Sequence, residues 1–412
     1  MAHGSSRGLR AYVNKVFEIE AALAGMSDSR REPTVPLAAV LTTWLWAFMR
    51  RLPSTEQVGQ MLSDRRWRRR LGLRDAEGGS ADTAARVLDE LLIEEINALC
   101  LAMFFVARRA RLLDEGPFGR RCVLVDLNEL FTSEKVHCDH CQVRKKKIVR
   151  NGAEKVVNEY YHQAVAMVWV GSDVAWPVGW ELLAPGEGEL TGALRLLDRL
   201  LPALRQSVDL VMGDGLYCCR PFFERVVRFG INGLAISSGQ TEMDEEIELL
   251  ERSHPGRMTT AKVEVWEYDS EAWAKDVGTT LRIVDYERRY AAKAYRHERQ
   301  HLRIVTTAPA EMVPAGQGWQ LGRSRWKIEN GTFNILTRDY ALTHNYHHST
   351  TAIAALLVFR SLAHVLTWAY RRYATARSKG APSSFVRWFH DVLVEDWVRY
   401  LDAANAVPSP SG

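Results

Sequence analysis

The chain has 412 residues, of which 47% are hydrophobic and 25% are charged, with 28 glycines and 14 prolines. This is the composition of a globular protein long enough for two or three domains, and it excludes collagen-like, low-complexity and wholly disordered chains. The 54 lysines and arginines are nearly balanced by 50 acidic residues, so the net charge of +4 permits a nucleic-acid partner without requiring one.

The apolar segments predict no membrane span. Residues 36–49 and 98–107 are too short to cross a bilayer, and Thr351–Trp368 is interrupted by Arg360 and His364. The N-terminus lacks the apolar region of a secretory signal, and the six cysteines do not form a disulfide scaffold in a chain of this size. We therefore expect the protein in a reducing cytoplasm.

The first part of the chain has a helical pattern. Apolar residues recur at helical spacing in 35–49, 56–62 and 81–112, and Ser54 with Gln57 forms a capping box ahead of the second segment. Between the second and third segments lies the densest basic cluster of the chain, with Trp67 inside it: Arg65, Arg66, Arg68, Arg69 and Arg70. The cluster fits a positively charged helix-turn-helix, or else a surface helix paired with neighbouring acids.

Beyond Arg121 the pattern changes to short runs of β-branched residues bounded by turn formers, which indicate strands. The expected strands are 122–127, 162–171, 208–212 and 231–237, with helices at 190–204 and 220–229. Strands with interspersed helices predict an α/β layer architecture.

The region 242–307 contains alternating polar and apolar segments, which favour half-exposed antiparallel strands. After Pro314 the pattern is helical again, over 323–338 and 350–373. The last residues, 404–412, are rich in proline and serine and predict a frayed tail.

Two aspartates directly follow apolar strand segments. Asp126 comes after the run 122–125, and Asp214 comes after 208–213. Either residue alone is more simply explained as a turn or helix-capping aspartate. If the two strands are neighbours, however, the two carboxylates converge.

Glu329 is a third carboxylate in an unusual position. The predicted helix 323–338 places it on one stripe with large apolar side chains, namely Trp326, Phe333 and Leu336. A carboxylate in such surroundings needs a cation. Arg325, four residues earlier, offers the alternative of an ordinary intrahelical ion pair. Gly331 counts against an uninterrupted helix.

The sequence around these acids can be compared with known enzymes. Three carboxylates from distant parts of a chain suit a site for two Mg²⁺ ions, which prefer oxygen ligands. The stretch 325–330, continued by Phe333, Leu336 and the run 344–348, resembles the segment around the last acidic residue in DDE transposases of bacterial insertion sequences. The Asp126 region, with Phe131 and the group 137–141 behind it, is similar to their first-Asp region, and Asp214–Tyr217 to their second. The resemblance covers about residues 121–348.

The resemblance implies an α/β fold with a ribonuclease-H-like core. It also implies a β-rich insertion between the last core strand and the helix that carries Glu329. The helical patterns near the two ends of the sequence add an N-terminal helical domain and C-terminal helices. In this arrangement Asp126, Asp214 and Glu329 bind two Mg²⁺ or Mn²⁺ ions, and Arg325 contacts phosphate or orients Glu329. The implied boundaries are 1–115 for the N-terminal domain, 116–240 and 313–348 for the core, 241–312 for the insertion, 349–403 for the C-terminal helices and 404–412 for the disordered tail.

The implied activity is cleavage of DNA at transposon ends and strand transfer into target DNA. The partners would be double-stranded DNA, as inverted-repeat ends and target, and a second copy of the chain, in the bacterial cytoplasm at the nucleoid. The residues expected to contact DNA are Arg65, Arg66, Arg68, Arg69, Arg70, Lys145, Lys146, Lys147 and Arg338. Two alternatives remain open, a catalytically inactive DNA-binding descendant and a nuclease without strand transfer.

The chain departs from one transposase subgroup at two positions. That subgroup has a Tyr, an Arg, the Glu and a Lys in one motif, and Arg325 fits the Arg. Gly322 stands in place of the Tyr, and Leu336 lies at the Lys spacing, with Arg338 the nearest basic residue. Leu127 follows Asp126 where relatives often have Gly. None of these changes removes a metal ligand.

A second metal site is predicted at Cys138 and Cys141. Four ligands taken from 137–141 are too cramped for one closed tetrahedral zinc site, so a pair of thiolates completed elsewhere, for instance by Cys218 or Cys219, is easier. The alternative is a hairpin with ordinary polar and thiol side chains.

Overall fold

The computed structural model describes residues 4–73, 79–150, 152–171, 173–237, 245–246, 249, 257–260, 263–271, 273–289, 299–378 and 384–403. The predicted tail 404–412 lies outside these residues. Contacts divide the chain into two compact units. The helical unit comprises 1–112, 129–162 and 335–412, and the sheet unit comprises 113–128 and 163–334.

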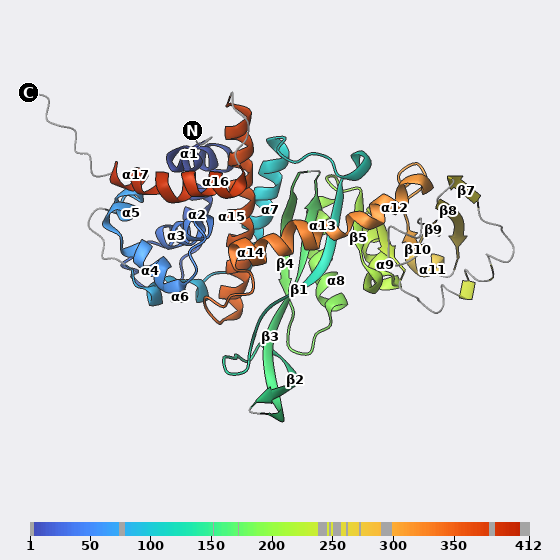
Figure 1. Cartoon of the computed structure of the whole chain (residues 1–412), viewed down its shortest axis with the longest axis horizontal. Helices are drawn as coiled ribbons and strands as arrows, with labels where there is room; N and C mark the ends of the chain where they lie inside the picture. The colour runs from blue at the N-terminus through green and yellow to red at the C-terminus, as the bar shows by residue number, and fades with distance from the viewer. Residues whose placement is uncertain are drawn as a thin grey trace, which may run out of the picture. The chain divides into compact units, whose positions relative to one another are not determined.

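The first part of the helical unit is helical, as the sequence predicts. Its helices are α1 (Ser6–Phe17), α2 (Ile19–Ala24), α3 (Leu37–Met49), α4 (Thr55–Ser63), α5 (Arg65–Arg70), α6 (Ala81–Asp89) and α7 (Ile93–Arg109) (Figure 1). Ser54 caps α4 as predicted, since its side chain accepts a hydrogen bond from the backbone amide of Gln57 at 3.3 Å, which is one half of the predicted capping box. The stretch 81–112 forms two helices instead of one, and the basic cluster forms a helix of its own.

The long helix α15 (Thr350–Ala376) forms the core of this unit. By length and composition it could cross a membrane, but 94% of its most apolar window is buried inside the protein, where it packs on α3, α6 and α7. Arg360 on this helix is buried and donates hydrogen bonds to the carbonyls of Leu342 and His344. These contacts are those of a core helix. The unit ends with α16 (Phe385–Phe389), the π-turn η4 (His390–Glu395) and α17 (Asp396–Asp402).

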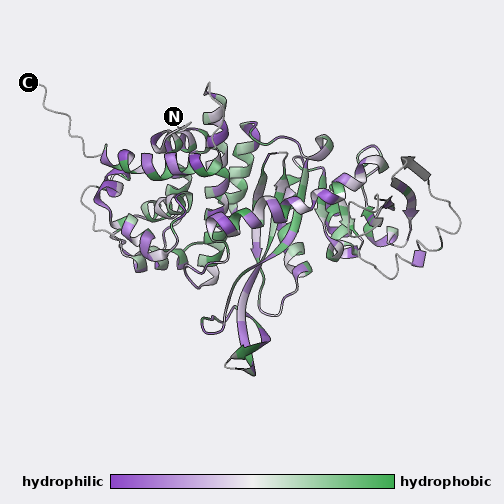
Figure 2. Ribbon diagram, viewed as in Figure 1, coloured by the Kyte–Doolittle hydropathy of each residue, from purple (hydrophilic) through white to green (hydrophobic). Residues whose placement is uncertain are grey.

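The sheet unit is built on one sheet that contains both parallel and antiparallel strand pairs. Its strands are β1 (Cys122–Ser133), β3 (Ala153–Val170), β4 (Ala175–Leu182), β5 (Leu210–Gly213), β6 (Asn232–Ile236), β7 (Arg257–Thr260), β8 (Val263–Ser270), β9 (Leu281–Arg289) and β10 (Arg299–Thr306). They follow the order β4-β3-β1-β5-β6-β10-β9-β8-β7, and β1, β5 and β6 are parallel. The fold is therefore mixed α/β, as predicted. In Figure 2 the central strands are green because their residues are hydrophobic, and these side chains are buried.

The predicted alternating segments of 242–307 form β8, β9 and β10, which pair antiparallel. The start of this region lies largely outside the described residues. In the helical unit, β2 (Gln142–Arg150) pairs antiparallel with the first half of β3. Helices α8 (Glu189–Leu204) and α9 (Arg220–Arg228) agree with the predicted helical patterns, and short helical segments lie at η1 (Pro117–Gly119), η2 (Gly215–Tyr217) and α11 (Ala274–Val277).

Candidate active site

Asp126 and Asp214 lie on neighbouring parallel strands of the sheet unit. The register pairs Cys122 with Leu210 and Leu124 with Met212, and its continuation sets Asp126 level with Asp214. Asp214 directly follows β5 and accepts a hydrogen bond from the Leu216 amide at 2.9 Å, so it also caps η2. Asp214 therefore caps a turn and also lies beside a second acid, Asp126, so the two interpretations of this residue do not exclude each other.

Glu189 is a third acid at this place, and sequence reasoning missed it. It occupies the first turn of α8 and accepts a hydrogen bond from the buried hydroxyl of Tyr217 at 2.8 Å. Burial raises the pKa of Asp126 to about 7, and the charges of Glu189 and Asp214 add to that shift. Burial and the charge of Asp214 also raise the pKa of Glu189. An acid at a helix N-terminus is common, because the helix dipole favours it, so its sequence signal is weak.

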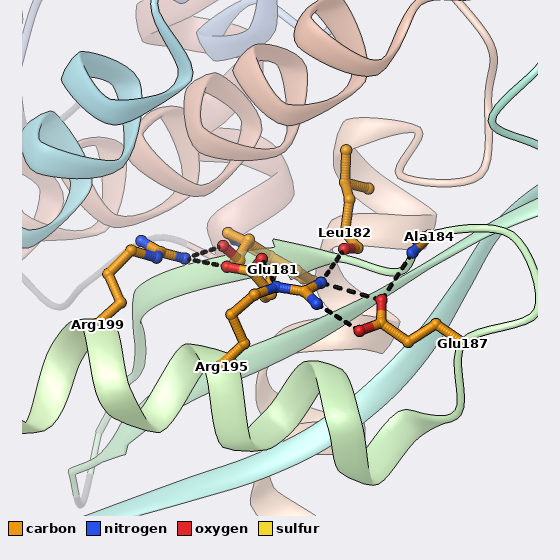
Figure 3. A network of polar contacts seen from close by, with 7 residues as sticks. Glu181, Leu182, Ala184, Glu187, Arg195 and Arg199 are labelled. Carbon is orange, nitrogen blue, oxygen red and sulfur yellow. Dashed lines mark hydrogen bonds and ion pairs between the residues drawn. The ribbon is translucent and has the colours of Figure 1, made fainter.

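An ion-pair network fixes the connection from β4 to α8 and so the position of Glu189 (Figure 3). Arg195 on α8 donates to Glu181 at 2.5 Å and to the carbonyl of Leu182 at 2.9 Å, and it also pairs with Glu187. Arg199, one turn further along, donates to Glu181 at 2.8 Å. The carboxylate of Glu187 accepts from the Ala184 amide at 2.8 Å, which closes the loop just before α8.

Glu329 lies in a helical run that starts earlier than predicted and is not uniform. The run consists of α12 (Ala315–Ser324), α13 (Trp326–Ile328), the π-turn η3 (Glu329–Phe333) and α14 (Asn334–Tyr340). The predicted stripe around Glu329 is only partly correct. Phe333 and Leu336 are buried as expected, but the π-turn holds an extra residue and rotates the faces on either side of it, so Trp326 does not share their side. Trp326 is accordingly 49% exposed, whereas Phe333 is buried.

Close packing against β4 explains why a glycine, Gly331, stands inside this helical run. A Cβ atom at this position would come within 3.2 Å of the Ala175 side chain on β4. Glycine therefore lets the helical run lie close against the sheet. The sheet in turn fixes the turn that presents Glu329.

Arg325 links Glu329 to the aspartates. Its guanidinium Nη1 lies 3.5 Å from a carboxylate oxygen of Glu329, which is the intrahelical pair that the spacing allows. Its positive charge also lowers the pKa of Asp126, so the same side chain acts on both acids.

The donor set fits divalent cations. Burial and the neighbouring carboxylates outweigh the charge of Arg325 at Asp126, so its pKa is raised, and hard divalent ions supply further positive charge through oxygen ligands. Among the described residues, Asp126, Asp214 and Glu329 do not form a group whose ligand atoms all lie within 4.8 Å of one another. A pair of ions about 3.5 to 4 Å apart bridges acids that are more widely spaced than this.

Comparison with protein families gives a match at this segment. Residues 183–366 match the model of the transposase DDE domain. The chain contains a transposase DDE domain. The match includes Glu189, Asp214, Arg325 and Glu329, and it starts after β1, which carries Asp126. No curated protein matches the chain.

Several arginines of α5 are engaged by other residues of the helical unit. Asp64 caps this helix, and its carboxylate pairs with Arg66, which also pairs with Asp402 at 2.9 Å. The guanidinium of Arg70 donates to the Tyr400 carbonyl and lies 4.3 Å from the centroid of the Tyr400 ring. Arg65 is exposed, whereas Arg68 and Arg69 are half-buried. The predicted turn is thus a helix, because Asp64 caps it and Trp67 anchors it in the core.

The remaining predicted DNA contacts lie on exposed positions of the helical unit. Lys145, Lys146 and Lys147 belong to β2 and are exposed. Lys146 lies 2.6 Å from Glu159, and Lys147 lies 3.8 Å from Glu154 on β3. Arg338 is exposed and pairs with its neighbour Asp339 at 2.8 Å.

The two departures from the transposase subgroup have packing reasons. A Cβ atom at Gly322 would lie 3.0 Å from Leu302 and 3.1 Å from Ile304 on β10, so α12 approaches the sheet too closely for a tyrosine. Leu336, at the Lys spacing, is fully buried. Both positions therefore pack in the core of this chain.

Gly322→Tyr is expected to destabilise the protein by about 1 to 3 kcal/mol, because an added ring in a packed contact forces side chains and backbone apart. Thermal unfolding of the purified chain measures this change. Gly316→Ala on the same helix is the matched control, since a Cβ atom there meets nothing within 4 Å. Alanine is the better helix former, so this control is expected to keep or raise the melting temperature. Equal melting temperatures for both variants would contradict the packing explanation.

Cys138 and Cys141 lie together in the helical unit with two histidines, His162 and His348. The residues that join the cysteine pair are therefore these histidines, and not Cys218 or Cys219. His137 instead stacks on Tyr160, with ring centroids 4.6 Å apart.

Proposed function

We propose that the chain is a metal-dependent transposase that cleaves DNA at transposon ends and joins the freed 3′ hydroxyl to target DNA. The observation that carries the proposal is the meeting of Asp126, Asp214, Glu189 and Arg325 at one place of the sheet unit. The strand order β4-β3-β1-β5-β6, with its last three strands parallel, supports a ribonuclease-H-like core.

The roles follow from the positions of the side chains. Asp126, Asp214 and Glu329 would hold two Mg²⁺ or Mn²⁺ ions, which supply activation of the attacking oxygen and stabilisation of the leaving oxygen. Arg325 binds the scissile phosphate or keeps Glu329 oriented. Water is the first nucleophile and the 3′ hydroxyl the second, and in-line displacement needs no covalent enzyme intermediate.

DNA binding is assigned to exposed basic residues of the helical unit. Arg65 on α5, the three lysines of β2 and Arg338 offer phosphate contacts. We expect Arg66 and Arg70 to contribute less than the sequence predicts, because acids and carbonyls already engage them. Phosphate contacts make affinity fall steeply with salt. Two copies of the chain would act together on paired ends.

The decisive experiment uses DNA that contains the transposon ends, which are found as inverted repeats flanking the gene. Incubation with Mg²⁺ or Mn²⁺ is expected to give nicks at the ends and joined products, and removal of the ions with EDTA is expected to abolish both. Binding of ends without metal-dependent cleavage would instead support the inactive DNA-binding descendant. Nicks without joined products would support a nuclease.

Glu189→Gln is expected to slow cleavage about 10- to 100-fold, the usual effect of losing a group that supports metal ligands. Its carboxylate contributes charge beside Asp126 and Asp214, and the amide removes that charge with little change of shape. Single-turnover cleavage rates measure the effect. Glu224→Gln is the control, since Glu224 is exposed on α9. Wild-type rates for Glu189→Gln would exclude this residue from the site.

A further inference from the structure

We propose that Cys138, Cys141, His162 and His348 bind one structural Zn²⁺ ion in the helical unit. The two cysteines belong to the turn between β1 and β2, His162 lies on β3, and His348 lies between α14 and α15. One ligand atom from each residue lies within 4.8 Å of the other three. All four residues belong to the helical unit.

The distances between these atoms match a tetrahedron around zinc. Zn–S bonds of about 2.3 Å and Zn–N bonds of about 2.0 to 2.1 Å require ligand atoms about 3.8 Å apart for two sulfurs, about 3.5 Å for sulfur and nitrogen, and about 3.4 Å for two nitrogens. The two Sγ atoms are 3.8 Å apart. Nε2 of His162 lies 3.4 Å from each Sγ, and Nε2 of His348 lies 3.2 Å from Sγ of Cys141. The two Nε2 atoms are 3.4 Å apart.

The donor types select zinc over the ions of the acidic site. Thiolates and imidazoles are soft to borderline ligands that suit Zn²⁺, whereas Mg²⁺ prefers oxygen. Four protein ligands close the coordination shell, which is the arrangement of a structural site. Cys141 and His162 are 5% and 1% exposed, so the site is shielded from solvent on the side of β3.

Asn345 provides an independent observation. Its buried side-chain oxygen Oδ1 has no hydrogen-bond partner within the described part of the chain, while its Nδ2 lies 3.2 Å from Nδ1 of His348. Turning the amide over lets Oδ1 accept a hydrogen bond from Nδ1–H of His348. This tautomer frees Nε2 for the metal, and a partner of this kind commonly orients a metal-bound histidine. The Phe131 ring packs edge-on against His348 at 4.8 Å and limits its rotation.

The proposed ion would connect segments that are far apart in sequence. Cys138 and Cys141 follow the strand that carries Asp126, and His348 follows the helical run that carries Glu329. Zinc would therefore hold together the ends of both elements.

The test starts with the untagged full-length chain, purified without added metal. We expect one zinc per chain by mass spectrometry. Replacement by Co²⁺ is expected to give sulfur-to-cobalt charge-transfer bands and the intense visible bands of tetrahedral cobalt. Cys141→Ser and His348→Ala are expected to lose the zinc. The matched controls Cys219→Ser and His137→Ala are expected to retain it.

Wild-type protein without zinc and without cobalt bands would overturn the proposal, and this measurement depends on no variant. Retention of one zinc per chain by Cys141→Ser would overturn it as well. Melting temperature gives a further readout, because metal that binds only the folded chain stabilises it. A strong zinc chelator is expected to lower the melting temperature of the wild type and of Cys219→Ser, and an unchanged value would contradict a structural role.

Discussion

Replacing Asp126 or Asp214 by asparagine is expected to slow cleavage of end-containing DNA by at least about 10³-fold. An amide keeps the shape of the side chain but carries no charge for a divalent ion, and such ions contribute several kcal/mol to the stabilisation of the transition state. Binding to the ends is expected to stay within a few-fold of wild type, since phosphate contacts come from other residues. Gel-shift affinities and single-turnover cleavage rates on the same DNA separate the two effects.

The melting temperatures of these variants show whether slow cleavage comes from lost catalysis or from lost folding. The pKa of Asp126 is raised to about 7, so the folded chain binds a proton more tightly than the unfolded chain does. Ionisation of this group therefore costs stability as the pH rises from about 4 to 7, and the cost persists above pH 7. In EDTA at pH 8, Asp126→Asn is expected to melt at or above the wild-type temperature. The exposed Asp198→Asn on α8 is the control and is expected to cleave at the wild-type rate. Normal cleavage by Asp126→Asn would remove this residue from the site.

The positions of Asp126 and Asp214 could be predicted because the local pattern is sufficient there, although β1 continues past Asp126 to Ser133, so this residue lies within the strand and not at its end. Continuous apolar runs predict buried strands, and an aspartate directly after such a run stands out. The parallel pairing of β1 and β5 then sets Asp126 level with Asp214, as expected for neighbouring strands.

Glu189 and the π-turn could not be predicted, because both depend on long-range packing. Glu189 looks like any acid in a first helical turn, and its role depends on the approach of α8 to Tyr217. Within the π-turn, Gly331 lies close to Ala175 on β4, a long-range approach that no local pattern encodes. The prediction of a regular helix therefore failed at Trp326.

The two histidines of the proposed zinc site also could not be predicted from local residue spacing. Cys138 and Cys141 form a recognisable pair. His162, however, lies on β3, and His348 lies just before α15, far along the chain from the cysteines. Cys218 and Cys219 looked suitable because thiolates bind zinc well. They follow Asp214 in the sheet unit, whereas the pair lies in the helical unit.

Trp67→Ala is expected to lower the free energy of unfolding by about 3 to 5 kcal/mol, the usual cost of removing a large aromatic side chain from a core. The Trp67 side chain is fully buried, and its ring lies 5.1 Å from the ring of Trp397 and 6.0 Å from that of Trp46. Its Nε1–H donates to the hydroxyl of Thr43 at 2.9 Å, so truncation also leaves that buried hydroxyl without this donor.

Urea unfolding of Trp67→Ala and of Arg65→Ala separates the two explanations of the basic helix α5. Arg65 is exposed, so its truncation is expected to change the free energy of unfolding by less than about 0.5 kcal/mol and to weaken DNA binding at low salt. Loss of stability in the first variant alone would show that Trp67 anchors the helix in the core while its exposed face remains available to phosphate. Equal stability of Trp67→Ala and wild type would contradict the anchoring, and α5 would then be a surface segment whose arginines serve binding alone.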